Sequence, residues 1–151
     1  MAIIRLTKKF DFEMAHALKD YDGLCAHLHG HSYRLEVTVA GEPMRQPGHP
    51  KNGMVMDFSD LKKIVKEEII DHCDHALMLN KSQETEIHSH DANSALWQRI
   101  ILVDYQPTSE NMLIDFAQRI EKRLPESVTL HHLVLHETAN SSSEWWKDEQ
   151  G

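Results

Sequence analysis

The segment with the clearest chemical potential is Cys25–Tyr33, which reads Cys-Ala-His-Leu-His-Gly-His-Ser-Tyr and places a thiol shortly before a His-Gly-His sequence. Side chains two residues apart on an extended strand point to the same face, so His29 and His31 can offer two imidazoles to one ion. The pattern predicts a metal site beside a cysteine that can act as a nucleophile or base. A third histidine ligand must then come from elsewhere in the chain.

Histidine is also the unusual feature of the composition, with 12 histidines in 151 residues. It is the commonest metal ligand and titrates nearest to neutral pH. A net charge of −8 without a cluster of Lys and Arg argues against binding to nucleic acid or to anionic membranes. Apolar runs stay shorter than the roughly 18 residues of a membrane span, the N-terminus is not signal-like, and Cys25 and Cys73 are far apart. We therefore expect a cytoplasmic protein.

Two long strands must position the histidines of this site. Residues 4–16 and 29–39 alternate between apolar and polar side chains, which predicts two half-buried strands. His16, His29 and His31 all fall on the apolar, inward side of this alternation. A buried imidazole without a partner costs about 1–3 kcal/mol, so each of these side chains requires one.

The remaining segments predict one domain over residues 1–151. Residues 41–53 are rich in Pro and Gly and predict a loop that returns through a short strand at 54–56. Apolar residues at helical spacing predict one helix from Asp57 or Ser59 to Asp74-His75 and another from Thr108 to Leu124. Further strands are expected at 100–103 and 128–138, an excursion from the core at about 81–106, and a loose polar tail from Ala139. This order predicts an α+β fold, an antiparallel sheet with two helices packed on one face.

Six segments, in order along the chain, resemble the 6-pyruvoyl-tetrahydropterin synthase family. They are 12–16, 25–33, 53–58, 74–75 with 79–80, 107–111 and 136–138. The gap of three residues between Cys25 and His-Gly-His is similar to the 6-carboxy-tetrahydropterin synthase branch of queuosine and 7-deazapurine biosynthesis. The resemblance implies the tunnelling fold, in which subunits join edge to edge into a barrel, with a hexamer and with active sites at subunit interfaces.

The resemblance implies that His16, His29 and His31 are ligands of Zn²⁺. Three imidazoles leave a tetrahedral zinc ion one open position, which is the arrangement of a catalytic site. Two alternatives stay open, since His27 shares the parity of His29 and His31 and Cys25 could close the coordination sphere.

The resemblance also implies the catalytic roles. Cys25 is expected to be the base, Asp74 and His75 to form the relay that helps the thiol ionise, and Glu137 to anchor the pterin ring. Without the resemblance, Asp74-His75 is equally well a helix end with no chemistry, and Cys25 a small buried residue.

The implied reaction converts 7,8-dihydroneopterin triphosphate to 6-carboxy-5,6,7,8-tetrahydropterin with release of acetaldehyde and triphosphate. One alternative is a 6-pyruvoyl-tetrahydropterin synthase, which eliminates triphosphate. Another is a metal-binding module without catalysis, which the 12 histidines motivate. Lys19, Arg34 and Lys51 are candidates for holding the triphosphate on this acidic chain.

Other reactive residue types receive structural interpretations. Glu110 lies in a first helical turn, where a carboxylate favourably meets the helix dipole. Cys73 fits the apolar stripe of its helix. His88 and His90 are at most a weak adventitious metal site in a polar segment. The histidines expected at the surface or in packing contacts are His72, His131, His132 and His136.

Overall fold

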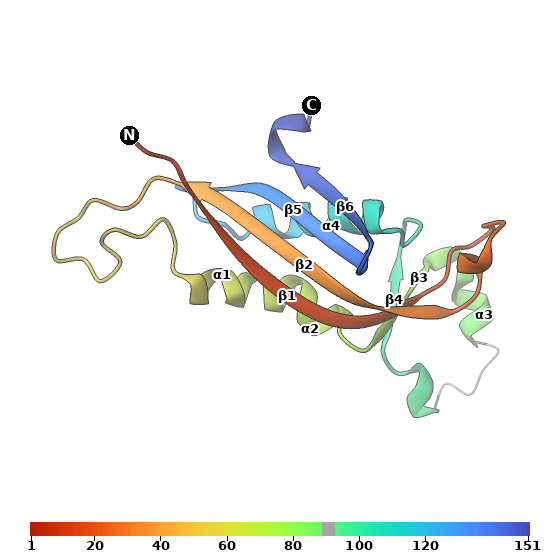
Figure 1. Ribbon diagram of the computed structural model, residues 1–151. Coiled ribbons are helices and arrows are strands. Elements are labelled where there is room, and N and C mark those ends of the chain that lie inside the picture. Colours follow the sequence, from red (N-terminus) through yellow and green to blue (C-terminus); the bar gives the residue numbers. More distant parts are fainter. Residues whose placement is uncertain (89–92) are drawn as a thin grey trace.

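One curved sheet of six strands organises the protein, whose computed structural model describes residues 1–88 and 93–151 (Figure 1). The strand order is β4-β3-β1-β2-β5-β6. The strands are β1 (Ile4–His16), β2 (His29–Gly41), β3 (Ala76–Asn80), β4 (Ile100–Val103), β5 (Val128–Thr138) and β6 (Ser141–Trp146). The helices are α1 (Phe58–Val65), which continues through a π-helical segment (Lys66–Ile70) into α2 (Asp71–Cys73), then α3 (Glu84–His88) and α4 (Ser109–Glu121).

Strands β1 and β2 form a long antiparallel pair whose alternation follows the sequence pattern. The register places Phe12 opposite Tyr33 and His16 opposite His29. Phe12 and Tyr33 stack with ring centroids 5.1 Å apart inside the core. The strands therefore carry their histidines on the same side as their buried aromatic residues.

The long helices cover the apolar face of the sheet (Figure 1). Asp57 accepts a hydrogen bond from the backbone N–H of Ser59 at 2.8 Å and begins α1, and Thr108 accepts one from Asn111 at 3.3 Å and begins α4. The buried side chains of α1 and α4 that pack on the sheet are Leu61, Ile64, Val65, Met112, Leu113, Phe116, Ala117 and Ile120. The α+β prediction with helices on one face is confirmed.

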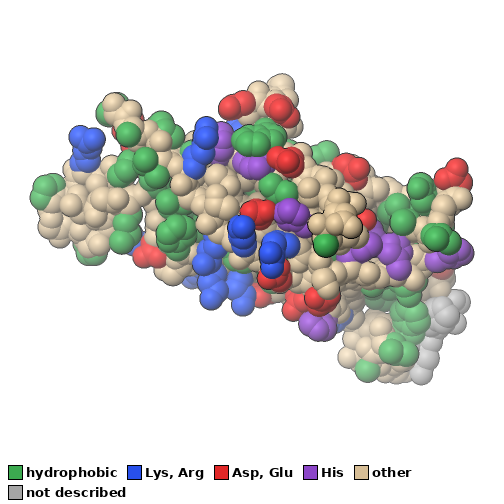
Figure 2. Space-filling view, viewed as in Figure 1, with side chains coloured by type: hydrophobic (Ala, Val, Ile, Leu, Met, Phe, Trp, Pro, Cys, Tyr) green, Lys and Arg blue, Asp and Glu red, His purple; other side chains and the backbone are tan. Residues whose placement is uncertain are grey.

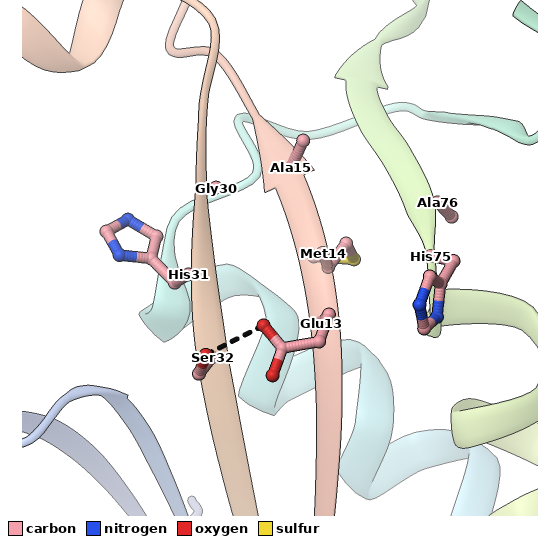
Figure 3. Close-up of a pocket in the computed structure, with 8 residues that line it drawn as sticks. All are labelled: Glu13, Met14, Ala15, Gly30, His31, Ser32, His75 and Ala76. Atoms are coloured by element: carbon pink, nitrogen blue, oxygen red, sulfur yellow. Dashed lines mark hydrogen bonds between the residues drawn. The ribbon is translucent and has the colours of Figure 1, made fainter. Parts of the chain in front are cut away.

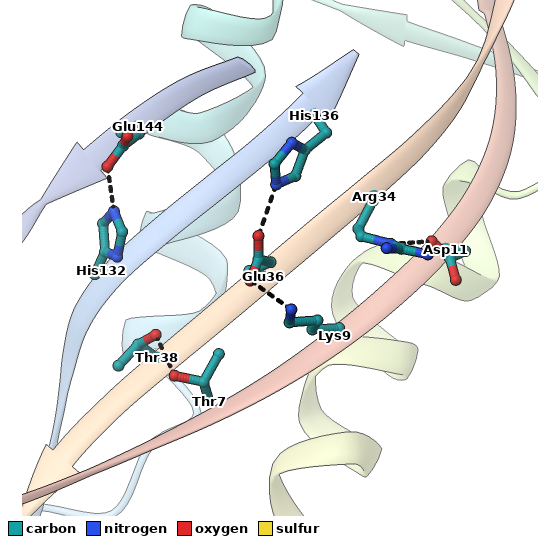
Figure 4. Close-up of polar contacts among 9 residues, drawn as sticks. All are labelled: Thr7, Lys9, Asp11, Arg34, Glu36, Thr38, His132, His136 and Glu144. Atoms are coloured by element: carbon teal, nitrogen blue, oxygen red, sulfur yellow. Dashed lines mark hydrogen bonds and ion pairs between the residues drawn. The ribbon is translucent and has the colours of Figure 1, made fainter. Parts of the chain in front are cut away.

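Polar side chains on the opposite face pair across neighbouring strands (Figure 4). His136 Nε2 lies 2.6 Å from Glu36 Oε2, and Arg34 Nε donates to Asp11 Oδ1 at 2.8 Å. The further pairs in Figure 4 are Lys9 with Glu36, His132 with Glu144, and Thr7 with Thr38. His132 and His136 thus take part in surface contacts, as the sequence predicts.

The structure differs from the sequence prediction in four elements. The sheet is mixed, because β3 runs parallel to both β1 and β4. Residues 54–56 form no strand, since the loop closes on itself through Met44, whose N–H donates to Met54 O at 2.9 Å and whose carbonyl accepts from Gly53 at 2.8 Å. β6 replaces the expected loose tail by pairing with β5, and α3 begins within the expected irregular excursion. In the described residues, no helix is long and apolar enough to span a membrane.

Candidate metal centre and active site

Three histidines converge where β1 ends and β2 begins. His16 pairs with His29 across the two strands, and His31 lies opposite Met14 on the same face. One nitrogen from each ring of His16, His29 and His31 lies within 4.8 Å of the other two. The predicted ligand trio is therefore brought together within one chain.

Backbone carbonyls set the tautomers of two of these rings. His16 Nδ1 lies 2.7 Å from Pro107 O, and His29 Nδ1 lies 2.6 Å from His27 O. Because a carbonyl only accepts, each Nδ1 carries the proton and each Nε2 of a neutral ring presents a lone pair. The two Nε2 atoms face one another at 3.1 Å. Two lone pairs at this distance favour a cation between them, and two nitrogens on a tetrahedral zinc ion would be separated by roughly 3.3 Å, from Zn–N bonds of about 2.0–2.1 Å.

The third ring presents an orphaned nitrogen to the same place. His31 Nε2 is buried without a hydrogen-bond partner among the described residues, and the nearest carboxylate oxygen, Glu137 Oε1, is 3.6 Å away. Burial lowers the pKa of His16 and of His31, although the contacts to Pro107 O and to the Glu137 carboxylate oppose this shift. Both rings are thereby held in the neutral form that binds metals. The residues present fit a tetrahedral ion with three imidazole ligands and one open position.

His27 contributes to this site through its backbone. Its carbonyl orients His29, whereas its imidazole is exposed and stands outside the trio. A carbonyl that accepts from the second nitrogen of a ligand histidine is a common way to orient the ring. The geometry gives the alternative of a His27 side-chain ligand no support.

A cavity of about 410 Å³ adjoins the histidines and is lined by His16, Cys25 and Glu137. Cys25 is half-buried in a 3₁₀ turn (Leu24–Ala26), and its carbonyl accepts from Leu18 N–H at 2.9 Å. The other lining residues are Leu18, Tyr21, Thr108, Ser109, Glu110, Ser141, Ser142 and Ser143. Predicted ligand, base and ring anchor thus share one cavity.

Sequence reasoning missed one wall of this cavity. Residues 141–143 belong to β6, and Ser143 Oγ lies 2.6 Å from Ser109 Oγ at the start of α4. Their polar sequence carries little strand signal, and their order comes from pairing with the edge of β5 and from the contact with Ser109. Glu110 also faces the cavity, so the helix dipole alone does not account for its position.

Asp74 and His75 form a pair at a different place in the chain. Asp74 Oδ1 lies 3.1 Å from His75 Nδ1 and accepts from Glu13 N–H at 2.9 Å, a backbone contact that lowers the Asp74 pKa. The His75 side chain is 74% exposed. Neither residue lines the cavity of Cys25. Figure 3 shows the His31 ring directed away from His75, with β1 between them. Within one chain, the predicted relay does not meet the predicted base.

The candidate triphosphate ligands are dispersed. Arg34 is paired with Asp11 and Lys51 with Asp60. In the view of Figure 2, most Lys and Arg side chains lie toward the half of the protein nearer the N-terminus, and several histidines lie toward the other end. Lys19 directly follows Leu18 of the cavity, and Gln106 holds both its backbone N–H and its carbonyl, at 3.1 and 2.7 Å. None of the three candidate cations lines the cavity of Cys25. The predicted pair His88 and His90 falls outside the side chains that the structure describes.

Comparison with known proteins connects this geometry to a family. Residues 5–148 match the family described as 6-pyruvoyl tetrahydropterin synthase. A 6-carboxy-5,6,7,8-tetrahydropterin synthase of Haemophilus influenzae is 35% identical over 145 residues, which cover 95% of this chain and 99% of that protein. A dihydroneopterin monophosphate aldolase of Pyrococcus furiosus is 34% identical over 133 residues, covering 88% and 89% of the two chains.

The fold has solved counterparts as well. The structure of Caenorhabditis elegans 6-pyruvoyl tetrahydropterin synthase superimposes with a TM-score of 0.66 at 24% identity, covering 97% of this chain and 96% of that one. Sequence and fold agree over nearly the whole length. The chain therefore belongs to the 6-pyruvoyl tetrahydropterin synthase family of enzymes.

Proposed function

We propose that this protein is a zinc-dependent lyase that converts 7,8-dihydroneopterin triphosphate to 6-carboxy-5,6,7,8-tetrahydropterin, releasing acetaldehyde and triphosphate in the cytoplasm. The observation that carries the proposal is the His16, His29 and His31 trio, in which the Nε2 atoms of His16 and His29 face one another and His16 lines a cavity shared with Cys25 and Glu137. The name of the relative from Haemophilus influenzae, a 6-carboxy-5,6,7,8-tetrahydropterin synthase, supports the choice of product.

Each residue of the cavity has a distinct task in this proposal. When bound, the metal ion supplies a Lewis acid that acidifies the side-chain hydroxyls of the substrate. Cys25, as a thiolate, removes a proton from the neighbouring carbon. Glu137 accepts two hydrogen bonds from the guanidine-like edge of the pterin and so holds the ring in one orientation.

The relay would reach Cys25 from a neighbouring subunit. Asp74 and His75 are solvent-accessible and do not line the cavity of Cys25 in the same chain. Around Cys25, the side chains of Tyr21, Leu24 and Leu28 are 49%, 85% and 58% exposed, which is typical of a surface that another chain covers. We therefore propose a homo-oligomer, a hexamer built from barrel-forming sheets, whose active sites combine residues of different subunits.

Two experiments test these proposals. Zinc-loaded protein incubated with dihydroneopterin triphosphate should release acetaldehyde and the carboxylated pterin, whereas neither product from a folded, zinc-loaded sample would refute the assignment. A pyruvoyl product would instead assign the chain to the triphosphate-eliminating synthases. For the shared site, C25A and H75N subunits, each strongly impaired alone, are unfolded together and refolded as mixed oligomers, which should regain activity. Mixtures that stay as impaired as the separate variants, although mixed assembly is demonstrated, would contradict a shared site.

A second candidate function is that of a dihydroneopterin monophosphate aldolase, favoured by the 34% identity to the Pyrococcus furiosus protein. Parallel assays with the monophosphate and the triphosphate separate the two activities, because the lyase proposal requires turnover of the triphosphate. A metal-binding module without catalysis would bind several ions per chain and would have no activity to lose on substitution of Cys25.

A further inference from the structure

The Asp74-His75 pair sits at a sharp corner of the main chain. α2 ends at Cys73, Asp74 is extended, and His75 adopts a φ of +60° before β3 begins at Ala76. A residue other than glycine in this left-handed region costs conformational free energy and persists only where surrounding contacts hold it. The position of the His75 ring thus depends on what holds the corner.

The corner at Asp74-His75 is held in part by hydrogen bonds to the backbone of β1. Glu13 N–H donates to Asp74 Oδ1 at 2.9 Å, and Glu13 O accepts from His75 N–H at 2.6 Å. These bonds hold the corner against the sheet, but they leave the carbonyls at the end of α2 without partners.

The side chain of Arg99 occupies that helix end. Its Nη2 donates to the carbonyls of Asp71, His72 and Asp74 at 3.1, 3.4 and 2.8 Å. The last carbonyls of a helix lack partners within the helix and carry partial negative charge, so a guanidinium satisfies both their bonding and their electrostatics. Arg99 therefore fixes the segment that leads into His75.

The backbone of Arg99 fixes the segment that leaves His75. Arg99 O accepts from Leu77 N–H at 2.8 Å, and the next residue, Ile100, pairs with Leu77 in the parallel ladder of β3 and β4. One residue thus contacts the chain on both sides of the corner, through its side chain before His75 and through its carbonyl after it.

We propose that Arg99 is a positioning residue for the Asp74-His75 relay, holding the left-handed corner that aims the His75 ring at the substrate. The inference rests on the relay role given to His75 under the proposed function. Arg99 acts through backbone carbonyls and does not contact the reacting atoms. Arg99 lies in the segment between Asn80 and Pro107. In this proposal, that excursion from the core therefore also contributes to the active site.

The test is a double-mutant cycle in the zinc-loaded oligomer with dihydroneopterin triphosphate as substrate. R99A should lower kcat about 10-fold or more with KM within about twofold, because a misplacement of about 1 Å can cost on the order of 10²-fold. R99K should restore part of the loss, since it keeps a cation near the carbonyls. In an H75N background, R99A should change kcat less than about twofold, as expected for residues that act together.

The control is R123A, which removes an arginine paired with Glu67 and Glu68 on the preceding helical segment without touching the corner. NMR of the His75 ring gives a readout independent of turnover, and R99A but not R123A should shift its resonances. Equal losses of kcat from R99A in both backgrounds, or an unchanged His75 signal, would overturn the inference. Full activity of H75N would instead overturn the relay assignment in the proposed function. If R99A does not fold, R99K and R99Q replace it in the same double-mutant cycle with H75N.

Discussion

His29→Ala is the sharpest test of the metal centre, with His27→Ala as its matched control. His29 is only partly buried, and its removal leaves the contact of His16 to Pro107 O intact. Substituting His16 would also leave the buried Pro107 carbonyl without a hydrogen-bond partner. This costs about 1–3 kcal/mol of stability and would obscure the effect on zinc affinity. His27→Ala removes a neighbouring imidazole but keeps the carbonyl that orients His29.

The magnitude follows from the ligand count. Zinc sites with four protein ligands bind with about 10–16 kcal/mol, so one ligand contributes about 2.5–4 kcal/mol. The expected loss of zinc affinity for His29→Ala is therefore roughly 10²–10³-fold, at about 1.4 kcal/mol for each factor of ten. For His27→Ala we expect a change below about threefold, since its ring is exposed and outside the trio.

The assay is competition for Zn²⁺ between metal-free protein and a chromophoric chelator at pH 7.5, with circular dichroism to verify the fold of each variant. Equal losses in the two variants would show that the His27 ring is a ligand and would refute the division of roles between ring and carbonyl. Undiminished affinity in a folded His29→Ala variant would refute the trio itself.

Three further predictions concern the cavity and its histidines. Cys25→Ala should keep full zinc content while kcat falls by about 10²–10⁴-fold, as expected for loss of a general base. The control Cys73→Ala should keep its activity, because Cys73 is a core thiol, and burial raises the pKa of this thiol to about 12. Glu137→Gln should raise the KM for the pterin by about 10- to 10²-fold, since a hydrogen bond to a charged group is worth about 1.5–3 kcal/mol, and unchanged steady-state kinetics would contradict its role as anchor. Metal-free protein should lose stability as pH falls below about 6.5, because burial lowers the pKa of His16 and His31 and the unfolded chain then binds more protons. Urea denaturation of metal-free protein at pH 7.5 and pH 5 measures this loss, and a variant lacking both rings should show less of it.

Much of the fold follows from local patterns. The period-two alternation of β1 and β2 predicts which side chains face the core, because an antiparallel pair with one buried face admits only one choice of side. Phe12 and Tyr33 are buried as that alternation requires. The apolar stripe and the Thr108 cap likewise predict α4. Such elements are predictable because each carries its own burial signal.

Other elements depend on partners that are remote in the sequence. β3 is a short apolar run directly after a helix, and its parallel pairing with β1 exists only once the corner at His75 returns the chain to the sheet. β6 begins with polar residues and is ordered because β5 offers an unpaired edge, where Trp145 is buried in the core and Trp146 comes to lie opposite His132. The residue patterns of β3 and β6 do not predict these pairings, because the stabilising hydrogen bonds are made with the backbone of another strand.

The sequence by itself determined the residue types of the site and the side of each strand on which they lie, since both follow from spacing along single strands. It also indicated His16, His29 and His31 as one ligand set through the order of motifs. Only the tertiary structure decided the tautomers, because Pro107 O reaches His16 from a segment far along the chain. It likewise separated Asp74-His75 from Cys25 within one chain, since neither residue lines the cavity of Cys25, and such a separation in space cannot be read from a linear sequence.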